Sequence, residues 1–187
     1  MTCAKIIITC LCLILESRTS IYLKTLYIIR HAKSSWDNLD LPDFDRPLND
    51  RGKRDAPRMG KRLKERDVTL DLMLSSPARR ALSTCKRIAK VLNYSKEKIS
   101  TDKALYHATE DDILLVLKKI NDHHTTVAIF GHNPGLTEFA NALTGKMISN
   151  IPTCGIVACQ LKIDSWKDAT WKNAEFLFFD FPKSKDD

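Results

Sequence analysis

Basic side chains follow three apolar segments of the sequence, at the points where these segments end. In chain order they are Arg30 and His31, then Arg79 or Arg80, and then His132. In open α/β sheets, ligands bind where the parallel strands end, so these groups are expected to meet at one edge. A helix that starts at Pro77 would add free backbone N–H groups and the positive end of its dipole. The residue types therefore predict a site for a doubly charged phosphate that holds two histidines.

Short apolar runs alternate with amphipathic stretches from Lys24 onward, which is the pattern of an α/β domain. The strands are expected at residues 26–29 (LYII), 70–74 (LDLML) and 126–130 (TVAIF), with two later strands at 155–161 and 174–181. Strands linked through helices are parallel in most such domains. The sequence therefore predicts a single three-layer α/β/α domain with a mostly parallel central sheet.

Helix start signals follow two of these segments. Ser76 is expected to cap a helix that Pro77 opens, because the first helical position needs no N–H. The buried face of this helix is predicted to contain Ala81, Cys85, Ile88, Ala89 and Leu92. Thr109 with Asp112 forms a capping-box-like start for a second helix. Its apolar face is predicted to contain Ile113, Leu114, Leu117 and Ile120.

The stretch 46–66 contains nine lysines and arginines. Apolar residues recur within it at helical spacing, so residues 49–66 are predicted to be helical, with a late start at Asp55 or a kink because of Pro57. Acidic residues interrupt the basic run, and no aromatic residues alternate with the charges as in a nucleic-acid-binding surface. We therefore interpret the run as a solvated helix face, and no nucleic-acid partner is expected.

Length and composition restrict the class of protein. The chain has 187 residues, 43% of them hydrophobic and 28% charged, which predicts one globular domain and excludes a disordered or polytopic membrane protein. Its net charge of +7 favours anionic ligands without choosing among them. The six cysteines form no CxxC pair and no paired Cys/His spacing. We expect reduced thiols in a cytoplasmic protein with no metal, no cofactor and no membrane partner.

Residues 1–23 differ from the rest of the chain and are treated as an N-terminal extension to a domain at 24–187. The apolar run 6–15 is too short to span a membrane but fits the hydrophobic region of a signal peptide. No A-x-A-like cleavage site follows, so we expect an extension that packs on the core or stays loose. A further hypothesis is that Leu23 marks the true start of translation, which an intact Met1 peptide in the native protein would contradict.

Three sequence elements resemble motifs of the histidine phosphatase superfamily, which includes the phosphoglycerate mutases. LYIIRHAKSSW (26–36) resembles the RHG-type motif, SSPARRA (75–81) resembles the SSPxxRA element, and GHNPGL (131–136) resembles the element with the second histidine. Residues 43–60, LYHA (105–108) and IPTCG (151–155) are similar to the short SixA-type phosphohistidine phosphatases. The resemblance covers residues 24–183 and implies the histidine phosphatase fold.

The resemblance implies a nucleophilic mechanism. His31 would attack the phosphorus in line, and water would hydrolyse the resulting phosphohistidine intermediate. Arg30 and Arg80 would bind the phosphoryl oxygens, and His132 would donate to a third oxygen. The choice of Arg80 over Arg79 follows the motif, in which the arginine directly precedes alanine.

The sequence also departs from the family pattern. Ala32 stands where the motif usually has glycine, and Lys33 follows where mutase-like members carry an acidic or amide residue. No glutamate occupies a clear general-acid motif, and the candidates for a general acid are Glu110 and Asp45. Glu110 lies at a helix start, where its alternative role is helix capping, and Asp45 has a structural role as its alternative. Asp37 stands where larger members often have an asparagine near the phosphate, and it is not counted among the predicted site residues.

A missing acid fits a substrate whose leaving group is an imidazole nitrogen, which is readily protonated. The predicted function is therefore hydrolysis of phosphohistidine on a partner protein. The alternatives are hydrolysis of small phosphate monoesters or anhydrides, and non-catalytic binding of phosphorylated partners. A mutase is not expected, and a monomer is favoured.

Other polar and aromatic residues carry weaker signals. Asn133 either orients His132 or touches substrate, or it is a turn residue before Pro134. The remaining histidines are expected on the surface or in loops: His107, His123 and His124. The tryptophans are expected to be packing residues, although Trp36 is close enough to His31 in sequence to line the mouth of the site.

Overall fold

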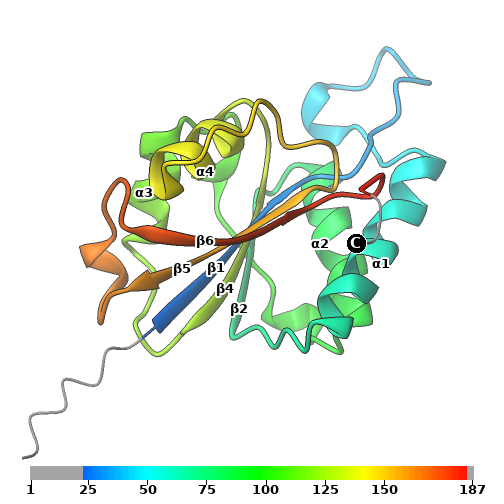
Figure 1. Cartoon of the computed structure of the whole chain (residues 1–187). Helices are drawn as coiled ribbons and strands as arrows, with labels where there is room; N and C mark the ends of the chain where they lie inside the picture. The colour runs from blue at the N-terminus through cyan, green and yellow to red at the C-terminus, as the bar shows by residue number, and fades with distance from the viewer. Residues whose placement is uncertain (1–22, 185–187) are drawn as a thin grey trace, which may run out of the picture.

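Six strands form one sheet, and helices cover both of its faces (Figure 1). The computed structural model describes residues 23–184. The strand order is β3-β2-β4-β1-β5-β6, with parallel pairing from β3 to β1 and antiparallel pairing of β5 with β1 and of β6 with β5. The strands are β1 (Leu23–Arg30), β2 (Leu72–Ser75), β3 (Ser100–Thr101), β4 (Thr126–Gly131), β5 (Ile156–Lys162) and β6 (Ala174–Asp180). The predicted mostly parallel sheet is confirmed.

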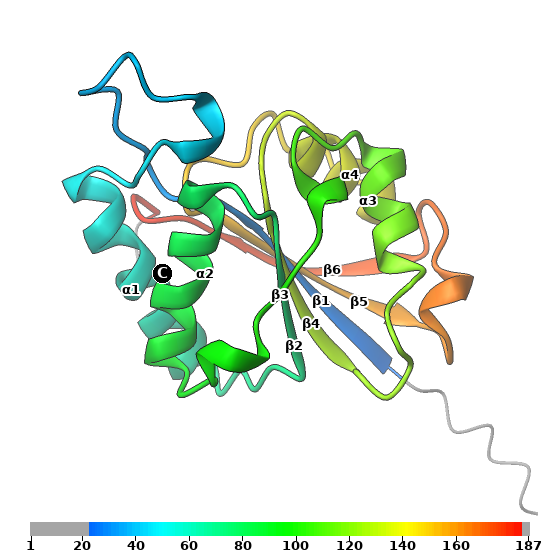
Figure 2. The same ribbon diagram turned by 180° about the vertical axis from the view of Figure 1, so that it is seen from behind.

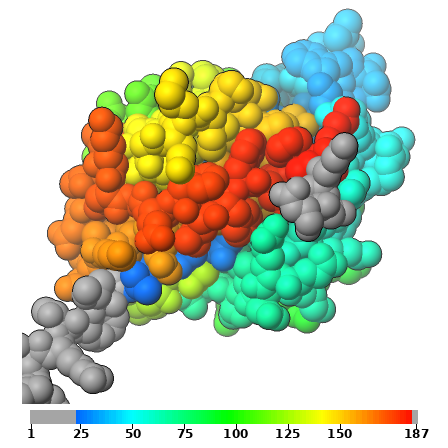
Figure 3. All heavy atoms as spheres, in the orientation of Figure 1, coloured from blue at the N-terminus to red at the C-terminus, as the bar shows by residue number. Residues whose placement is uncertain are grey.

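The helices form the two outer layers. Helices α1 (Asp50–Glu65) and α2 (Arg79–Val91) lie on one face of the sheet, and α3 (Glu110–Leu117) and α4 (Gly135–Thr144) lie on the other (Figures 1 and 2). Short 3-10 helices lie in the connections: η1 (Asp43–Asp45), η2 (Lys96–Lys98), η3 (Lys103–Leu105) and η4 (Trp166–Asp168). The segment between β1 and α1, which contains η1, projects from the body of the domain (Figures 1 and 3). The three-layer α/β/α architecture is confirmed.

Each face of the sheet has its own hydrophobic core, because successive strand residues point to opposite faces. Along β1, Leu26 and Ile28 join the core under α3 and α4, while Tyr27 and Ile29 join the core under α1 and α2. The apolar run at 26–29 is thus buried on both faces, as expected for a central strand of an α/β sheet.

The first described strand begins at Leu23, which pairs with Lys162 of β5. The next residue, Lys24, is buried, and its Nζ donates to the backbone oxygens of Asp122 and His124. The predicted apolar run at 6–15 and the rest of residues 1–22 lie outside the described part of the chain. Within residues 23–184, no helix combines the length and the apolar character needed to cross a membrane.

Helix α1 corrects the expected effect of Pro57. The helix begins at Asp50 and includes Pro57, so the late start at Asp55 was wrong. The cap fixes the start, because the Asn49 side chain accepts the backbone N–H of Gly52 at 2.9 Å. The predicted apolar positions of this helix are buried: Ala56, Met59 and Leu63.

Helix α2 begins two residues later than expected, at Arg79. The backbone of Ala78 is extended (ψ 133°), so the helix cannot begin at Pro77, and Ser76 is not its N-cap residue. The Ser76 hydroxyl instead accepts the N–H of Ala78 at 3.3 Å, in the turn before the helix. Most of the predicted inner face is buried: Ala81, Cys85, Ile88 and Ala89.

The other predicted elements need smaller corrections. The capping box of Thr109 and Asp112 is confirmed at the start of α3. Strand β2 covers residues 72–75 rather than 70–74. Helix α4 was not predicted, although it directly follows the turn with the second histidine and packs closely: a Cβ added at Gly135 would clash with the Ala108 carbonyl oxygen.

Candidate active site

The three predicted basic positions converge at one edge of the sheet. Strands β1 and β4 are neighbours in parallel register, with Arg30 beside Gly131, so His31 and His132 leave the sheet side by side. Their ring centroids are 5.1 Å apart. Arg80 reaches the same place from the first turn of α2, and its Nε donates to His31 Nε2 at 3.3 Å. The sheet and one helix thus position two imidazoles and a guanidinium in contact.

The environment of His31 keeps its ring neutral. Its Nδ1 lies 2.8 Å from the backbone oxygen of Ala32, which suits an Nδ1–H donor, and its Nε2 accepts from Arg80. Burial lowers the pKa of His31 to about 4 against the opposing hydrogen bond to Ala32, and the charges of Arg80 and Arg30 lower it further. At neutral pH, Nε2 therefore carries no proton, and its lone pair, which accepts from Arg80, is the one a nucleophile needs.

Arg80 has a partner for each of its three donor nitrogens. Besides His31, Nη1 donates to the backbone oxygen of Asp43 and Nη2 donates to its carboxylate at 2.8 Å. Arg80 is buried, whereas Arg79 is exposed, and its one hydrogen bond within residues 23–184 is to the backbone oxygen of Asp45, at 3.5 Å. Of the two arginines, Arg80 is the one beside His31.

His132 is a buried neighbour of the nucleophile. Its Nε2 lies 2.9 Å from Ser76 Oγ, and its Nδ1 is buried without a partner among the described residues. Burial lowers the pKa of His132 to about 3, and the neighbouring His31, Arg80 and His107 act in the same direction. The ring is therefore neutral at ordinary pH, and one of its nitrogens has no hydrogen-bond partner among the described residues.

Arg30 is held by the segment before β5. Its Nη1 donates to the Ile151 carbonyl oxygen at 2.7 Å and to Asn150 Oδ1 at 3.2 Å. The Asn133 side-chain amide donates to the same two oxygens, at 3.2 and 2.8 Å. Two buried atoms of this group have no partner in the described chain: Arg30 Nε and Asn133 Oδ1. Asn133 thus lies within the cluster, joined to Arg30 through Asn150.

Sequence reasoning missed the contacts of Asp43, which closes one side of the site. Its carboxylate accepts from Arg80, from Arg46 at 3.0 Å and from the Tyr106 hydroxyl at 3.0 Å. Burial alone would raise the pKa of Asp43, but the hydrogen bonds from Tyr106, Arg80 and Arg46 outweigh it, so the pKa is lowered. Asp43 and Tyr106 lie in the stretches 43–60 and 105–108, which resemble the SixA-type sequences. This resemblance was the only sequence signal for the two residues.

The basic run does not lie wholly on a solvated face. Arg46 is buried, donates from Nη2 to Ser34 Oγ at 2.7 Å, and places its guanidinium carbon 3.2 Å from the centre of the exposed Trp36 ring. Arg62 forms an ion pair with Asp180 at 2.6 Å. The interpretation of the run as a solvated face was therefore wrong for these two arginines.

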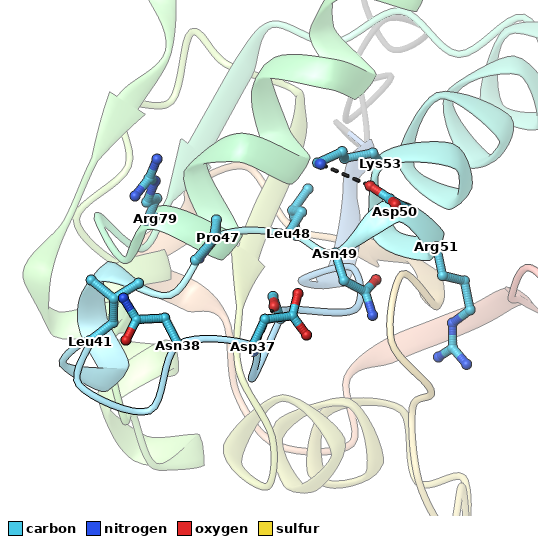
Figure 4. Close-up of a pocket in the computed structure, with 11 residues that line it drawn as sticks. Asp37, Asn38, Leu41, Pro47, Leu48, Asn49, Asp50, Arg51, Lys53 and Arg79 are labelled. Atoms are coloured by element: carbon cyan, nitrogen blue, oxygen red, sulfur yellow. Dashed lines mark hydrogen bonds and ion pairs between the residues drawn. The ribbon is translucent and has the colours of Figure 1, made fainter.

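The weak acid candidates do not contact the predicted nucleophile. The side chains of Asp45 and Glu110 form no hydrogen bond or ion pair within residues 23–184. Glu110 is the first residue of α3, where Asp112 rather than Glu110 completes the capping box. Asp37 lines a cavity of about 590 Å³ between the projecting segment and the start of α1, together with Leu41, Leu48 and Arg79 (Figure 4). None of the four predicted catalytic residues lines this cavity.

The other predicted residues lie as follows. His107 is exposed in a loop, as expected, but it stacks on His132 with a centroid distance of 6.3 Å. Trp166 is fully buried, as expected for a packing residue. In the described residues, no group of three or more histidine, cysteine and acidic side chains is arranged to hold a metal. The cysteines of this part are free, buried thiols: Cys85, Cys154 and Cys159.

The fold and the site define an α/β protein with a pair of neutral histidines among arginines at the carboxyl edge of a parallel sheet. A family model described as histidine phosphatase superfamily (branch 1) matches residues 26–109. An uncharacterized chloroplastic protein of Arabidopsis thaliana is 31% identical over 154 residues, which cover 78% of this chain and 70% of that protein. An uncharacterized protein of Mycobacterium leprae is 30% identical over 83% of this chain and its own full length. The chain belongs to the histidine phosphatase superfamily.

Solved structures share the fold. The protein histidine phosphatase SixA complexed with tungstate superimposes with a TM-score of 0.73 at 22% identity, covering 84% of this chain and 97% of that one. A phosphoglycerate mutase from Bacillus anthracis superimposes with a TM-score of 0.65 at 17% identity, covering 79% of this chain and 91% of that one. The predicted superfamily and fold are confirmed, and phosphatase activity is supported at the level of the family.

Proposed function

We propose that this protein is a phosphohistidine phosphatase that removes the phosphoryl group from a histidine of a partner protein through a covalent intermediate on His31. The observation that carries the proposal is the state of His31: a half-buried, neutral imidazole whose Nε2 accepts a hydrogen bond from the Arg80 guanidinium. An arginine beside the nucleophile both disfavours its protonation and attracts the anionic substrate.

The reaction has two displacements. In the first, the lone pair of His31 Nε2 forms a bond to phosphorus as the bond to the leaving imidazole nitrogen breaks, and that nitrogen takes up a proton. In the second, a water oxygen attacks the phosphorus, the bond to His31 breaks, and inorganic phosphate leaves. Arg30, Arg80 and His132 bind the phosphoryl oxygens during both steps, with Asn133 beside Arg30, and stabilise the charge of the transition state.

The charge state of the carboxylates supports a nitrogen leaving group. Asp43 is the carboxylate that contacts the site, and its lowered pKa keeps it ionised at neutral pH, so it has no proton to donate. An alkoxide leaving group needs a general acid in the transition state. An imidazole nitrogen is basic enough to take a proton from solvent, which favours phosphohistidine over a phosphate monoester.

The surface beside the site supports the proposal that the phosphohistidine belongs to a partner protein. The projecting segment that supplies Asp43 also exposes Trp36 by 60% and Leu39 by 83%. Aromatic side chains are enriched at protein–protein interfaces, so the exposed Trp36 is consistent with a polypeptide partner. The cavity beside the same segment is lined in part by Arg79, the sequence neighbour of Arg80, and offers further space for a polypeptide (Figure 4).

The second candidate function is hydrolysis of small phosphate esters or anhydrides. It is favoured by a 2,3-bisphosphoglycerate-dependent phosphoglycerate mutase of Mesorhizobium japonicum, which is 32% identical over 92 residues that cover 48% of this chain and 45% of that protein. Such a substrate would fill the phosphoryl site without using the exposed segment.

Phosphate release from a synthetic phosphohistidine peptide and from p-nitrophenyl phosphate tests the proposal. The proteins are the wild type, His31→Asn, and His123→Asn as a control in an exposed loop. We expect faster release from the peptide, lost in His31→Asn and retained in His123→Asn. Faster release from the ester would establish the second candidate, and no release from either would indicate a protein that only binds phosphorylated partners.

A further inference from the structure

The Ser76 hydroxyl lies between two buried groups. Its oxygen is 2.9 Å from His132 Nε2 and accepts the backbone N–H of Ala78 at 3.3 Å. Ser76 is fully buried and His132 is 6% exposed, so water does not compete for these contacts. The arrangement of hydrogens within this group is therefore set by the protein.

The hydroxyl hydrogen of Ser76 has one acceptor within residues 23–184. A hydroxyl group carries one hydrogen and two lone pairs. The Ala78 N–H occupies one lone pair, and the hydrogen can reach only His132 Nε2. If Nε2 itself carried a hydrogen, two N–H groups would point at Ser76 Oγ and the hydroxyl hydrogen would be buried without an acceptor, which is unfavourable.

We propose that Ser76 is a positioning residue that donates to His132 Nε2 and so fixes the hydrogen of the neutral ring on Nδ1. His132 Nδ1 is buried and has no partner in the described chain, so its N–H is the free donor of a ring whose centroid lies 5.1 Å from that of His31. The inference deepens the proposed function, on which it rests, by assigning the donor atom that meets the phosphoryl oxygen. With the hydrogen on Nε2, the Nδ1 lone pair would instead repel an anion.

The charged groups around His132 do not supply this control. Arg80 and the neighbouring rings of His31 and His107 disfavour a charged His132, and Asp43 acts in the opposite direction. These groups act on the total charge of the ring, and none of them forms a hydrogen bond to its nitrogens. Ser76 is the described residue that distinguishes one ring nitrogen from the other.

Nitrogen NMR of the phosphate-free protein with ¹⁵N-labelled histidines tests the assignment directly. The two-bond couplings to the ring protons show which nitrogen carries the hydrogen, and His132→Asn identifies the signals. We expect the Nδ1–H form in the wild type. We expect the same form in Ser75→Ala, a matched control in which the neighbouring buried serine loses only its hydrogen bond to the Ser76 carbonyl oxygen. An Nε2–H form in the wild type would overturn the proposal, even if Ser76→Ala fails to fold.

Turnover of the phosphohistidine peptide adds a functional readout. We expect kcat to fall at least about tenfold in Ser76→Ala, by loss of an oriented donor. KM should change less, Ser76→Thr should restore part of kcat through its hydroxyl, and Ser75→Ala should behave as wild type. Equal kcat in Ser76→Ala and wild type would refute the role of Ser76. No turnover by the wild type would instead refute the proposed function and leave the NMR result standing.

Discussion

The half-buried, neutral state of His31 predicts a loss of stability in mild acid. Its pKa is about 4 in the folded protein against an ordinary value of 6.5. Between these pH values the unfolded chain binds a proton at His31 that the folded chain does not, so the free energy of unfolding falls as pH falls. The contribution of neutral His31 to the free energy of unfolding is fully present above about pH 6.5 and is lost as pH decreases toward 4. For one group with these pKa values, the loss between about pH 7 and 4.5 is about 2 kcal/mol.

Urea unfolding of the wild type and His31→Asn at a series of pH values measures this contribution. Asparagine removes the titrating group and keeps a polar side chain of similar size, so the carboxylates that titrate in the same range are common to both proteins. We expect the wild type to lose about 2 kcal/mol more than the variant over this interval. If the free energy of unfolding changed with pH in the same way in both proteins, this would refute the argument that burial and the nearby arginines lower the pKa of His31.

Three further substitutions test the supports of the site. Thr84→Val removes the buried hydroxyl that accepts the Ala32 N–H and donates to the Arg80 carbonyl oxygen, so urea unfolding should show a loss of about 1–3 kcal/mol. Gly52→Ala places a Cβ in collision with the Lys33 carbonyl oxygen, so the loop after β1 must move, and both thermal stability and phosphate release should fall. Arg80→Lys removes the planar guanidinium that contacts His31. We expect kcat/KM on the phosphohistidine peptide to fall about a hundredfold or more. An unchanged kcat/KM would exclude bidentate binding of the phosphoryl oxygens by Arg80.

The sequence predicts those parts of the site that lie at strand ends. Apolar runs identify β1 and β4, and parallel neighbours bring the residues that follow them to the same edge, so Arg30, His31 and His132 are predicted as a group. The choice of Arg80 over Arg79 came from the motif resemblance, and the helix start at Arg79 gives it a physical basis, because Arg80 then lies on the inner side of the first turn.

The residues that sequence reasoning missed depend on loops. Asp43 is 37 positions from Arg80, and Asn150 is 120 positions from Arg30. Neither lies in a periodic segment, and the residue types alone do not reveal which distant group each one meets. The helix start at Pro77 was also misplaced, because a serine before a proline is an ordinary cap signal, whereas the Ser76 hydroxyl instead contacts Ala78 and His132.

The most direct test of the central claim is to trap the phosphorylated enzyme. The wild type is mixed with a ³²P-labelled phosphohistidine peptide, quenched in alkali within the first turnover, and digested for mass spectrometry. The proposed mechanism predicts a base-stable, acid-labile label on the peptide that contains His31, formed before phosphate is released and absent in His31→Asn. Phosphate release without a labelled enzyme, or a label that persists in His31→Asn, would contradict it.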